Sequence, residues 1–364
     1  MKFRCERDLL ADAIGTAARA SASRGAGHPV LAGVHVHLVG DRLTVTGTDL
    51  ELLIEVSTTV AGSEDGHCVL PARLVGDVVR AAPAGAVEVT VGPEEARLSA
   101  GRTVFSLRTM AVEDFPRSSP PAANATSIPA ADLGEALRQV VRAASSDEAR
   151  PVLTGVLMSA EGEGLRLVAT DSYRLAVRDL AGQSVLSAGQ KVLVPSRALN
   201  ELTRLLPASG EVVLRLGERD ATFEIGGVRL TTRLIEGEFP NYRQLIPSSH
   251  PNRMRVNRAN LLDAIRRVKI LARDSSPVRL RMTAEQLELV AVTQDMGNAD
   301  EALDASFDGG DLTVAFNPDY LSSGVEAVGG EEVVIETLDA LKPALLRSAE
   351  DNGYLYLLMP VRVP

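Results

Sequence analysis

Apolar positions along the chain follow the same succession of spacings three times. Each third begins with a short stretch of strand pattern, followed by apolar residues three and four positions apart, which is the spacing of an amphipathic helix. These helices are predicted around Leu9–Ile14, Leu133–Leu137 and Leu261–Ile265. Asp132 and Asn260 stand where a helix N-cap or a first-turn residue would stabilise the helix. The pattern therefore predicts one structural unit that is repeated three times.

Alternating apolar runs follow each helix and predict β-hairpins. The paired runs are Val34–Val39 with Leu43–Thr46, Val156–Ala160 with Leu165–Ala169, and Val278–Met282 with Leu287–Val292. Gly40-Asp41 and Glu161-Gly162-Glu163-Gly164, which connect the first two pairs, include residues that tolerate a positive φ. We expect each hairpin to pack its apolar face on the helix before it.

A strand that enters a second helix recurs in the later half of each third. The three segments are Cys68–Leu74, Val192–Ala198 and Val314–Tyr320, and each has a proline near the first helical turn. Two helices for each antiparallel sheet predict an α+β fold with the helices gathered on one face. The predicted domains are residues 1–119, 126–247 and 252–364, separated by short linkers rich in proline and small residues.

Composition and length agree with this organisation. A chain of 364 residues with 45% hydrophobic residues has enough apolar material for several cores. No apolar run approaches the roughly 18–20 residues that span a bilayer, and charges interrupt the N-terminal residues at once. Cys5 and Cys68 lack metal or redox spacing. These features predict a cytoplasmic protein with no membrane contact. The net charge of −10 argues, as an average, against nucleic-acid binding, but the electrostatic field depends on where the charges lie, so the sum alone decides nothing.

One polar turn between two strands is of special interest because it recurs. It is Ala169-Thr170-Asp171-Ser172-Tyr173-Arg174-Leu175-Ala176-Val177, and Gly47-Thr48-Asp49-Leu50-Glu51-Leu52 is similar. Val292-Thr293-Gln294-Asp295 is a weaker copy. Asp49 and Asp171 could be catalytic acids, but repetition at a turn favours a structural role. Only the middle copy continues with Tyr-Arg-Leu, so we look for function there.

Several short motifs follow one another along the whole chain. They are Met1-Lys2-Phe3, Gly47-Thr48-Asp49-Leu50-Glu51, Val69-Leu70-Pro71-Ala72-Arg73, Ala169-Thr170-Asp171, Arg174-Leu175-Ala176-Val177, Phe239-Pro240-Asn241-Tyr242-Arg243 and Met359-Pro360-Val361-Arg362. In this order and at this spacing they resemble the bacterial DNA polymerase III beta subunit, the replicative DNA sliding clamp. The resemblance implies three clamp domains that form half of a closed ring, with helices inside around double-stranded DNA. It also implies a head-to-tail homodimer without catalytic chemistry or a cofactor. The implied partners are the replicative polymerase, the clamp loader and repair polymerases, which bind through a clamp-binding peptide.

The resemblance also implies a pocket for that peptide between the second and third domains. Its expected residues are Leu153, Thr170, Ser172, Tyr173, Arg174, Leu175, Pro240, Gln244, Leu245, Asn317, Tyr320, Pro343, Leu357, Leu358, Met359, Pro360, Val361 and Arg362, with Arg150 and Asn317 at its margin. A mostly apolar cleft with a few polar groups suits one aromatic and one aliphatic anchor. Taken one segment at a time, the sequence favours the ordinary interpretation, in which residues 357–360 are a core strand and Arg174 is a surface charge.

Basic residues at helical spacing are candidates for contact with DNA phosphates. They are Arg24, Arg73, Arg80, Arg138, Arg142, Arg150, Arg197, Arg204, Arg266, Lys269 and Arg273. Spacings of three, four and seven place several of them on common helix faces, where they would attract phosphate independently of sequence. Ordinary solvated helix faces are the alternative for any single pair. The third repeat departs from the pattern, because Asp319 and Glu326 stand where the other two have arginine.

Dimerisation, as the resemblance implies it, joins an edge strand of domain one to the end of domain three. The expected contact is Phe105 and Leu107 against Ile270 and Leu271. A specialised second clamp copy, for repair or for insensitivity to a clamp-directed inhibitor, remains the alternative function. An enzyme is disfavoured, since the chain lacks nucleotide-binding glycine motifs and a convincing catalytic triad.

A metal site is also disfavoured. His35 and His37 face the same side of a strand, but the sequence offers no third ligand near them.

Overall fold

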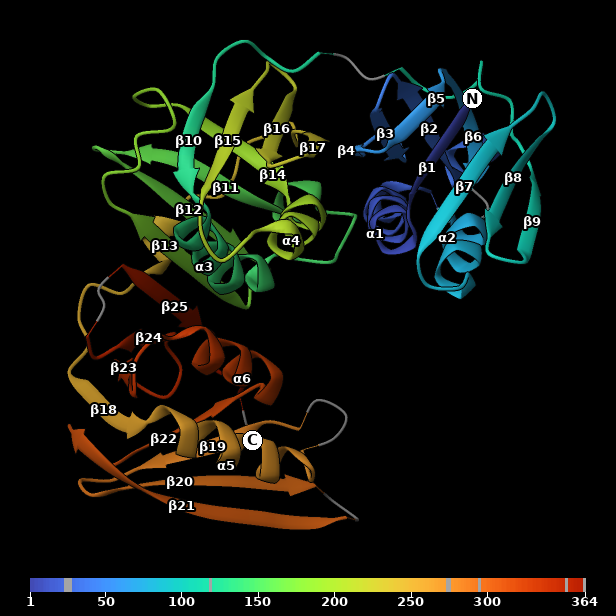
Figure 1. Cartoon of the computed structure of the whole chain (residues 1–364). Helices are drawn as coiled ribbons and strands as arrows, with labels where there is room; N and C mark the ends of the chain where they lie inside the picture. The colour runs from blue at the N-terminus through green and yellow to red at the C-terminus, as the bar shows by residue number, and fades with distance from the viewer. Residues whose placement is uncertain (23–27, 118–119, 273–275, 294–295, 351–352, 363–364) are drawn as a thin grey trace. The chain divides into compact units, whose positions relative to one another are not determined.

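The computed structural model describes residues 1–22, 28–117, 120–272, 276–293, 296–350 and 353–362. The chain divides into two compact units, Met1–Ala131 with Arg204–Leu234, and Asp132–Thr203 with Ile235–Pro364. The described helices are α1 (Arg7–Ala17), α2 (Ala72–Ala81), α3 (Ala130–Val140), α4 (Ser196–Leu205), α5 (Arg258–Lys269) and α6 (Pro318–Ala327). They confirm the two predicted helices in each repeat (Figure 1).

The first unit contains two antiparallel sheets. The five-stranded sheet has the order β5 (Ala61–Glu64), β1 (Lys2–Glu6), β7 (Ala86–Val91), β8 (Glu95–Ala100) and β9 (Thr103–Arg108). The eight-stranded sheet has the order β10 (Thr126–Pro129), β15 (Glu211–Leu216), β16 (Asp220–Ile225), β17 (Val228–Arg233), β4 (Leu52–Thr59), β3 (Arg42–Thr48), β2 (Gly33–Val39) and β6 (Gly66–Pro71). In this second sheet β17 pairs with β4, so the sheet continues from the first repeat into the second.

The second unit contains one antiparallel sheet of twelve strands. Its order is β14 (Lys191–Pro195), β11 (Gly155–Glu161), β12 (Gly164–Thr170), β13 (Arg174–Leu180), β25 (Tyr354–Leu358), β24 (Ala344–Ser348), β23 (Glu332–Thr337), β18 (Asn252–Asn257), β21 (Gly297–Asp308), β20 (Gln286–Thr293), β19 (Val278–Met282) and β22 (Leu312–Phe316). Here β13 pairs with β25, which joins the second repeat to the third. The equivalent strands therefore join neighbouring repeats at both junctions.

Short 3-10 helices occupy several of the connections. They are η1 (Ala18–Ala20), η2 (Pro29–Ala32), η3 (Val141–Ala143), η4 (Pro151–Leu153) and η5 (Tyr242–Leu245). All three predicted hairpins are present, as β2–β3, β11–β12 and β19–β20. In the first, Gly40 has a φ of 56°, which suits the two-residue turn.

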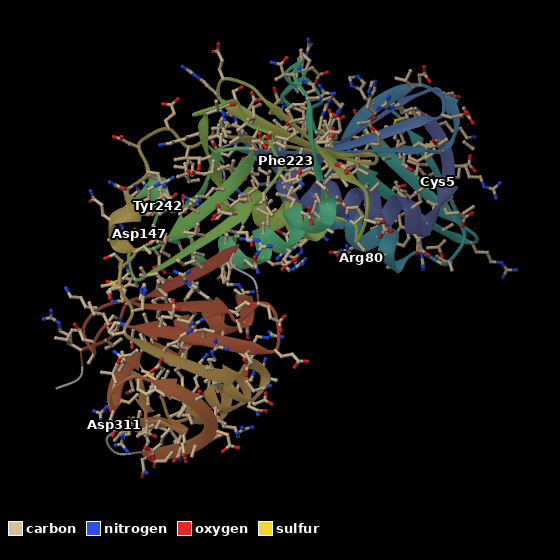
Figure 2. All side chains as sticks on the ribbon, turned by 90° about the vertical axis from the view of Figure 1, so that its left-hand side faces the viewer. Cys5, Arg80, Asp147, Phe223, Tyr242 and Asp311 are labelled. Atoms are coloured by element: carbon tan, nitrogen blue, oxygen red, sulfur yellow. The ribbon has the colours of Figure 1, made fainter. Side chains whose placement is uncertain are left out.

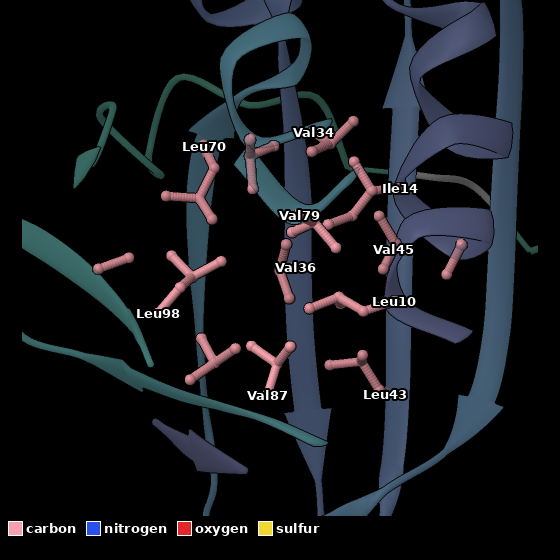
Figure 3. Packing of buried hydrophobic residues seen from close by; sticks show 14 of the residues in the cluster. Leu10, Ile14, Val34, Val36, Leu43, Val45, Leu70, Val79, Val87 and Leu98 are labelled. Atoms are coloured by element: carbon pink, nitrogen blue, oxygen red, sulfur yellow. The ribbon is translucent and has the colours of Figure 1, made fainter. Parts of the chain in front are cut away.

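The core of the first repeat shows why the spacing pattern produces this fold. Leu10 and Ile14 lie four positions apart on α1 and point toward the sheet, as Figure 3 shows. They pack with Val79 of α2 on the alternating residues Val36 of β2 and Val45 of β3. The helical period of 3.6 and the strand period of 2 thus supply one apolar layer.

Helix starts agree with the prediction, because Asp132 and Asn260 lie in the first turns of α3 and α5. The N-cap of α5 is Asn257, whose side chain accepts a hydrogen bond from the backbone N–H of Asn260. Pro318 is the first residue of α6, whereas Pro71 and Pro195 are the last residues of β6 and β14. None of the described helices combines the length and apolarity that a bilayer crossing requires.

Candidate functional site

The turn between β12 and β13 is held by side-chain hydrogen bonds. The Thr170 hydroxyl donates to the backbone oxygen of Arg174 at 2.6 Å. One oxygen of Asp171 accepts from the backbone N–H groups of Tyr173 at 2.9 Å and Arg174 at 3.0 Å. These bonds stabilise Ser172 at a φ of 81°, a conformation that is rare for a residue other than glycine.

The first repeat contains the same turn, bond for bond. The Thr48 hydroxyl donates to Leu52 at 2.9 Å, and Asp49 accepts from the N–H groups of Glu51 and Leu52. Leu50 takes the place of Ser172, with a φ of 80°. The structural role predicted for the two aspartates is confirmed. In the third repeat the corresponding Gln294 and Asp295 lie outside the described residues.

Arg174 extends from this turn into a cluster of aromatic side chains. Its Nε donates to the second oxygen of Asp171 at 2.9 Å, and both side chains are largely buried. The guanidinium carbon lies 4.4 Å from the centre of the Tyr320 ring, a cation–π distance. Tyr173, which is 59% exposed, stacks on the same ring with centroids 6.4 Å apart. A fixed positive charge thus lies beside an accessible aromatic surface.

Tyr320 and the neighbouring Tyr356 remain neutral hydrogen-bonding groups. Burial raises the pKa of Tyr356, and burial together with the Asp171 carboxylate raises the pKa of Tyr320. The Tyr356 hydroxyl donates to the backbone oxygen of Tyr320 at 2.9 Å. This bond ties the start of α6 to β25 and so helps to position the Tyr320 ring over Arg174.

The C-terminal strand borders the same turn. In the β13–β25 ladder, Arg174 is opposite Leu358 and Leu175 is opposite Leu357. Beyond β25, the backbone N–H of Met359 donates to the oxygen of Tyr173 at 2.9 Å. The predicted association of the Tyr173–Leu175 segment with the C-terminal residues therefore occurs in the structure.

Burial divides the predicted pocket residues into two groups. Leu153, Thr170, Leu175, Leu357 and Leu358 are buried, and Leu175 and Leu357 belong to one core cluster with Tyr242. The remaining residues are at least partly accessible: Ser172, Tyr173, Arg174, Pro240, Gln244, Leu245, Asn317, Tyr320, Pro343, Met359, Pro360, Val361 and Arg362. The accessible group would contact a ligand directly, while the buried group would support it from behind.

Two margin residues have additional roles. Asn317 is the N-cap of α6, and its side-chain oxygen accepts from the N–H groups of Asp319 and Tyr320. Arg150 donates to the Ser172 hydroxyl at 3.0 Å and to Asp147 at 2.9 Å. Arg150 therefore lies at the β12–β13 turn, outside the helices, whereas most of the predicted DNA-facing residues lie on helices.

The predicted DNA-facing residues on α2, α3, η3, α4 and α5 are accessible, Arg142 and Lys269 in part and the others fully on the surface. They are Arg73, Arg80, Arg138, Arg142, Arg197, Arg204, Arg266 and Lys269. Figure 2 shows Arg80 on the side of α2 away from the strand with Cys5. Arg24 and Arg273 lie outside the described residues. Sequence reasoning missed Arg7 and Arg19, which line a hollow of about 770 Å³ together with Arg80.

The two halves of the predicted dimer contact differ in how exposed their residues are. β9 lies at the edge of its sheet. Along it, Phe105 is half-buried against the core and Leu107 is buried in it, whereas Val104 is 46% exposed. Ile270, just after α5, is 67% exposed, and Leu271 is partly buried.

The expectation that no third ligand lies near His35 and His37 is wrong. His67 of β6 is opposite His37 in the strand ladder, and its Nδ1 lies 3.3 Å from Nε2 of His35. Strand pairing brings together residues about thirty positions apart, which a local pattern cannot predict. Even so, within the described ranges no three histidine, cysteine or acidic side chains are arranged to hold a metal ion. Both cysteines are free and buried, and burial raises the pKa of Cys5 to about 11 and of Cys68 to about 12.

Domain profiles match almost the whole chain. Residues 1–119 match the DNA polymerase III beta subunit N-terminal domain, residues 127–241 its central domain and residues 243–362 its C-terminal domain. The chain belongs to the DNA polymerase III beta subunit family. This membership and the antiparallel sheets with paired helices establish three clamp domains of α+β type.

Several proteins are similar to this chain over its full length. It is 35% identical to the beta sliding clamp of Streptomyces coelicolor over the whole of both chains, and 30% identical to the beta sliding clamp homolog GriR of Streptomyces muensis, covering 99% of that protein. Its structure superposes on the Bacillus subtilis sliding clamp with a TM-score of 0.94 at 29% identity, covering both chains completely. The Pseudomonas aeruginosa DnaN clamp bound to griselimycin gives 0.93 at 29% identity, again over the full length of both.

Proposed function

We propose that this chain is a DNA sliding clamp, a processivity factor that encircles double-stranded DNA and tethers polymerases. The observation that carries the proposal is that accessible arginines occupy matching helix positions in the first two of the three repeats, Arg73 and Arg80 on α2 and Arg197 and Arg204 on α4. Such residues attract phosphates without regard to sequence, as a protein that slides requires. The clamp would act in the cytoplasm by holding its partners on DNA. It would have no catalytic site and no cofactor of its own.

The decisive test is processive synthesis on a primed circular template with a polymerase and a clamp loader. Adding the protein should convert short products into full-length ones. On a linear template with free ends the gain should be lost, because a closed ring slides off. Equal stimulation on both templates would contradict topological tethering. The alternative of a specialised second copy has no specific support, as the Streptomyces coelicolor sliding clamp is more similar than GriR.

Ring closure by a head-to-tail dimer is supported by the way the repeats join. β4 pairs with β17 at one junction, and β13 pairs with β25 at the other. β9 of the first repeat corresponds to β17 and β25, and β21 of the third repeat corresponds to β4 and β13. β9 is an edge strand, and the Gly297–Asp304 part of β21 pairs with β20 on one side, so each has an edge left for a further strand. A second copy could therefore repeat the same strand pairing between β9 and β21, and two such contacts would close a ring.

Ile270→Glu tests this interface without disturbing the folded subunit, because the side chain is 67% exposed. We expect monomers in sedimentation velocity, whereas Val39→Glu, at a 54% exposed position on the strand β2, should leave the dimer intact. Charging Leu107 would be a poorer test, since it lies in the core. A dimer that withstands Ile270→Glu would argue against the proposed contact.

The surface around Tyr173, Arg174 and Met359 is the proposed pocket for a partner peptide. Its support is an accessible aromatic and thioether surface beside a charge that Asp171 orients. The replicative polymerase, the clamp loader and repair polymerases would each present a peptide of the Gln-Leu-x-Leu-Phe type. The similar clamp of Pseudomonas aeruginosa has been solved with griselimycin bound, so a member of this family binds a ligand.

Calorimetry with a Gln-Leu-x-Leu-Phe peptide tests the pocket. Arg174→Ala combined with Met359→Ala should weaken binding by about tenfold or more, which corresponds to at least about 1.4 kcal/mol. Arg281→Ala, on β19 with its side chain 48% exposed, is the control and should bind as the parent does. Unchanged affinity in the double variant would refute the pocket.

A further inference from the structure

Helix α6 differs from its counterparts in the other repeats at two matching positions. α2, α4 and α6 each contain ten residues and follow a strand. The second and ninth residues are Arg73 and Arg80 in α2, and Arg197 and Arg204 in α4. In α6 they are Asp319 and Glu326. Positions seven apart lie on one helix face, so α6 presents two carboxylates where the other helices present two guanidinium groups.

Both carboxylates form ion pairs with residues that are candidates for DNA contact. α5 and α6 pack side by side (Figure 1), and Lys269 of α5 is hydrogen-bonded to Asp319. Glu326 lies 3.1 Å from Arg142 of η3 and 3.8 Å from Arg266 of α5, which also pairs with Asp263 of its own helix at 3.2 Å. Three cations of this unit are thus each paired with an acid of α6.

Carboxylate and phosphate oxygens are equivalent ligands for ammonium and guanidinium groups. A DNA phosphate that approaches Lys269, Arg142 or Arg266 must displace a carboxylate and is repelled by it. The pairs are accessible, with 66% of the Asp319 side chain and 42% of the Lys269 side chain exposed, so they can exchange partners. The acids would therefore compete with DNA without excluding it.

We propose that Asp319 and Glu326 act as internal competitors of DNA phosphate. They lower the affinity of the third clamp domain for the duplex and flatten its salt dependence. The inference rests on the proposed clamp function, and it identifies the residues that set how firmly this chain holds DNA. Retention would then depend on ring closure, and sliding would meet little resistance from the third domain.

Glu326 also has a structural setting that must be separated from competition. Near it, Arg142 donates to the backbone oxygen of Ser323 at 3.3 Å, and Gln139 donates to that of Ala327 at 3.0 Å. Loss of Glu326 could loosen this contact between η3 and α6. Asp319 lies in the first turn, at the opposite end of α6, and its pair with Lys269 is independent of that contact. Asp319→Asn is therefore the clean variant.

Equilibrium binding to a short linear duplex, followed by fluorescence anisotropy from about 50 to 200 mM NaCl, tests the proposal. Each lysine or arginine that is freed from its carboxylate and contacts a phosphate steepens the slope of log K, where K is the association constant for DNA, against log salt concentration by about 0.9. We expect Asp319→Asn to steepen it by about 1, and Asp319→Asn with Glu326→Gln by about 2 or more, with affinity at low salt raised about fivefold or more. Glu285→Gln with Asp311→Asn, at exposed positions in turns of the same repeat, makes the same change in net charge and is the control.

The outcomes separate this proposal from the function on which it rests. Equal slopes in the α6 variants and the control would overturn it, because only net charge would then matter. An effect confined to variants that lack Glu326, together with a lower unfolding temperature, would also overturn it in favour of a structural role. If the parent chain is not retained on circular DNA after loading, the clamp function itself fails. Normal retention with unchanged slopes would reject the competition alone.

Discussion

Replacing Gly324 with alanine is expected to destabilise the second compact unit, although alanine favours helices. A Cβ at this position of α6 would lie 2.5 Å from Cδ1 and Cε1 of the buried Tyr356 ring and 3.2 Å from Leu346. Overpacking of this kind costs about 1–3 kcal/mol. Displacing the ring also endangers the hydrogen bond from Tyr356 to Tyr320, worth about 1 kcal/mol. The gain in helix propensity is about 1 kcal/mol, so the free energy of unfolding should fall by about 1–3 kcal/mol.

Gly15→Ala in α1 is the matched control. No atom lies within 4 Å of the Cβ that it would add, so only the propensity term acts and stability should rise by about 0.5–1 kcal/mol. The same substitution in two helices is thus expected to have opposite signs. The contrast isolates the contact with Tyr356 from the intrinsic preference of the residue.

Urea unfolding can follow each unit separately. The chain has five tyrosines and no tryptophan, and all five tyrosines lie in the second unit, so tyrosine fluorescence reports on Gly324→Ala. Far-UV circular dichroism reports on Gly15→Ala. Since Tyr356 precedes Leu357 and Leu358 on β25, Gly324→Ala should also weaken peptide binding, and Gly15→Ala should not. A Gly324→Ala variant as stable as the parent would refute the reasoning, as α6 and β25 would then separate freely.

Two further predictions concern the first repeat. Gly47→Ala would put a Cβ 2.1 Å from the backbone oxygen of Ala17. Amide hydrogen exchange should therefore show that β3 loses more than about 2 kcal/mol of protection. An unchanged exchange rate in β3 would contradict the close approach. Burial, then the charges of His67 and His37, lowers the pKa of His35 to about 4 from the ordinary value of 6.5. The unfolded chain therefore binds this proton first, and stability should fall by about 2–3 kcal/mol as pH drops from about 6.5 to about 4. His35→Gln should remove that part of the pH dependence of the free energy of unfolding, measured in urea. If the variant and the parent have the same pH profile, the burial of His35 is not the cause of the pH dependence.

The amino-acid sequence by itself determined the repeated unit, its elements and its family. Apolar spacing locates helices and hairpins because each depends on neighbours only a few positions away, as for α1 and the β2–β3 hairpin. The Thr-Asp turns were equally predictable, since Asp49 and Asp171 bond to backbone groups two and three residues ahead. Those local rules act identically in every repeat, which is why the threefold pattern is visible in one sequence.

Contacts between distant residues were decided only by the tertiary structure. Pairing of β4 with β17 and of β13 with β25 joins the repeats, and no spacing rule specifies which strands meet across well over a hundred residues. The same holds for His67 beside His35, for Glu326 beside Arg142, and for the opposite expected effects at Gly15 and Gly324. A local pattern states which face of an element is apolar. What lies against that face follows from the packing of the whole unit.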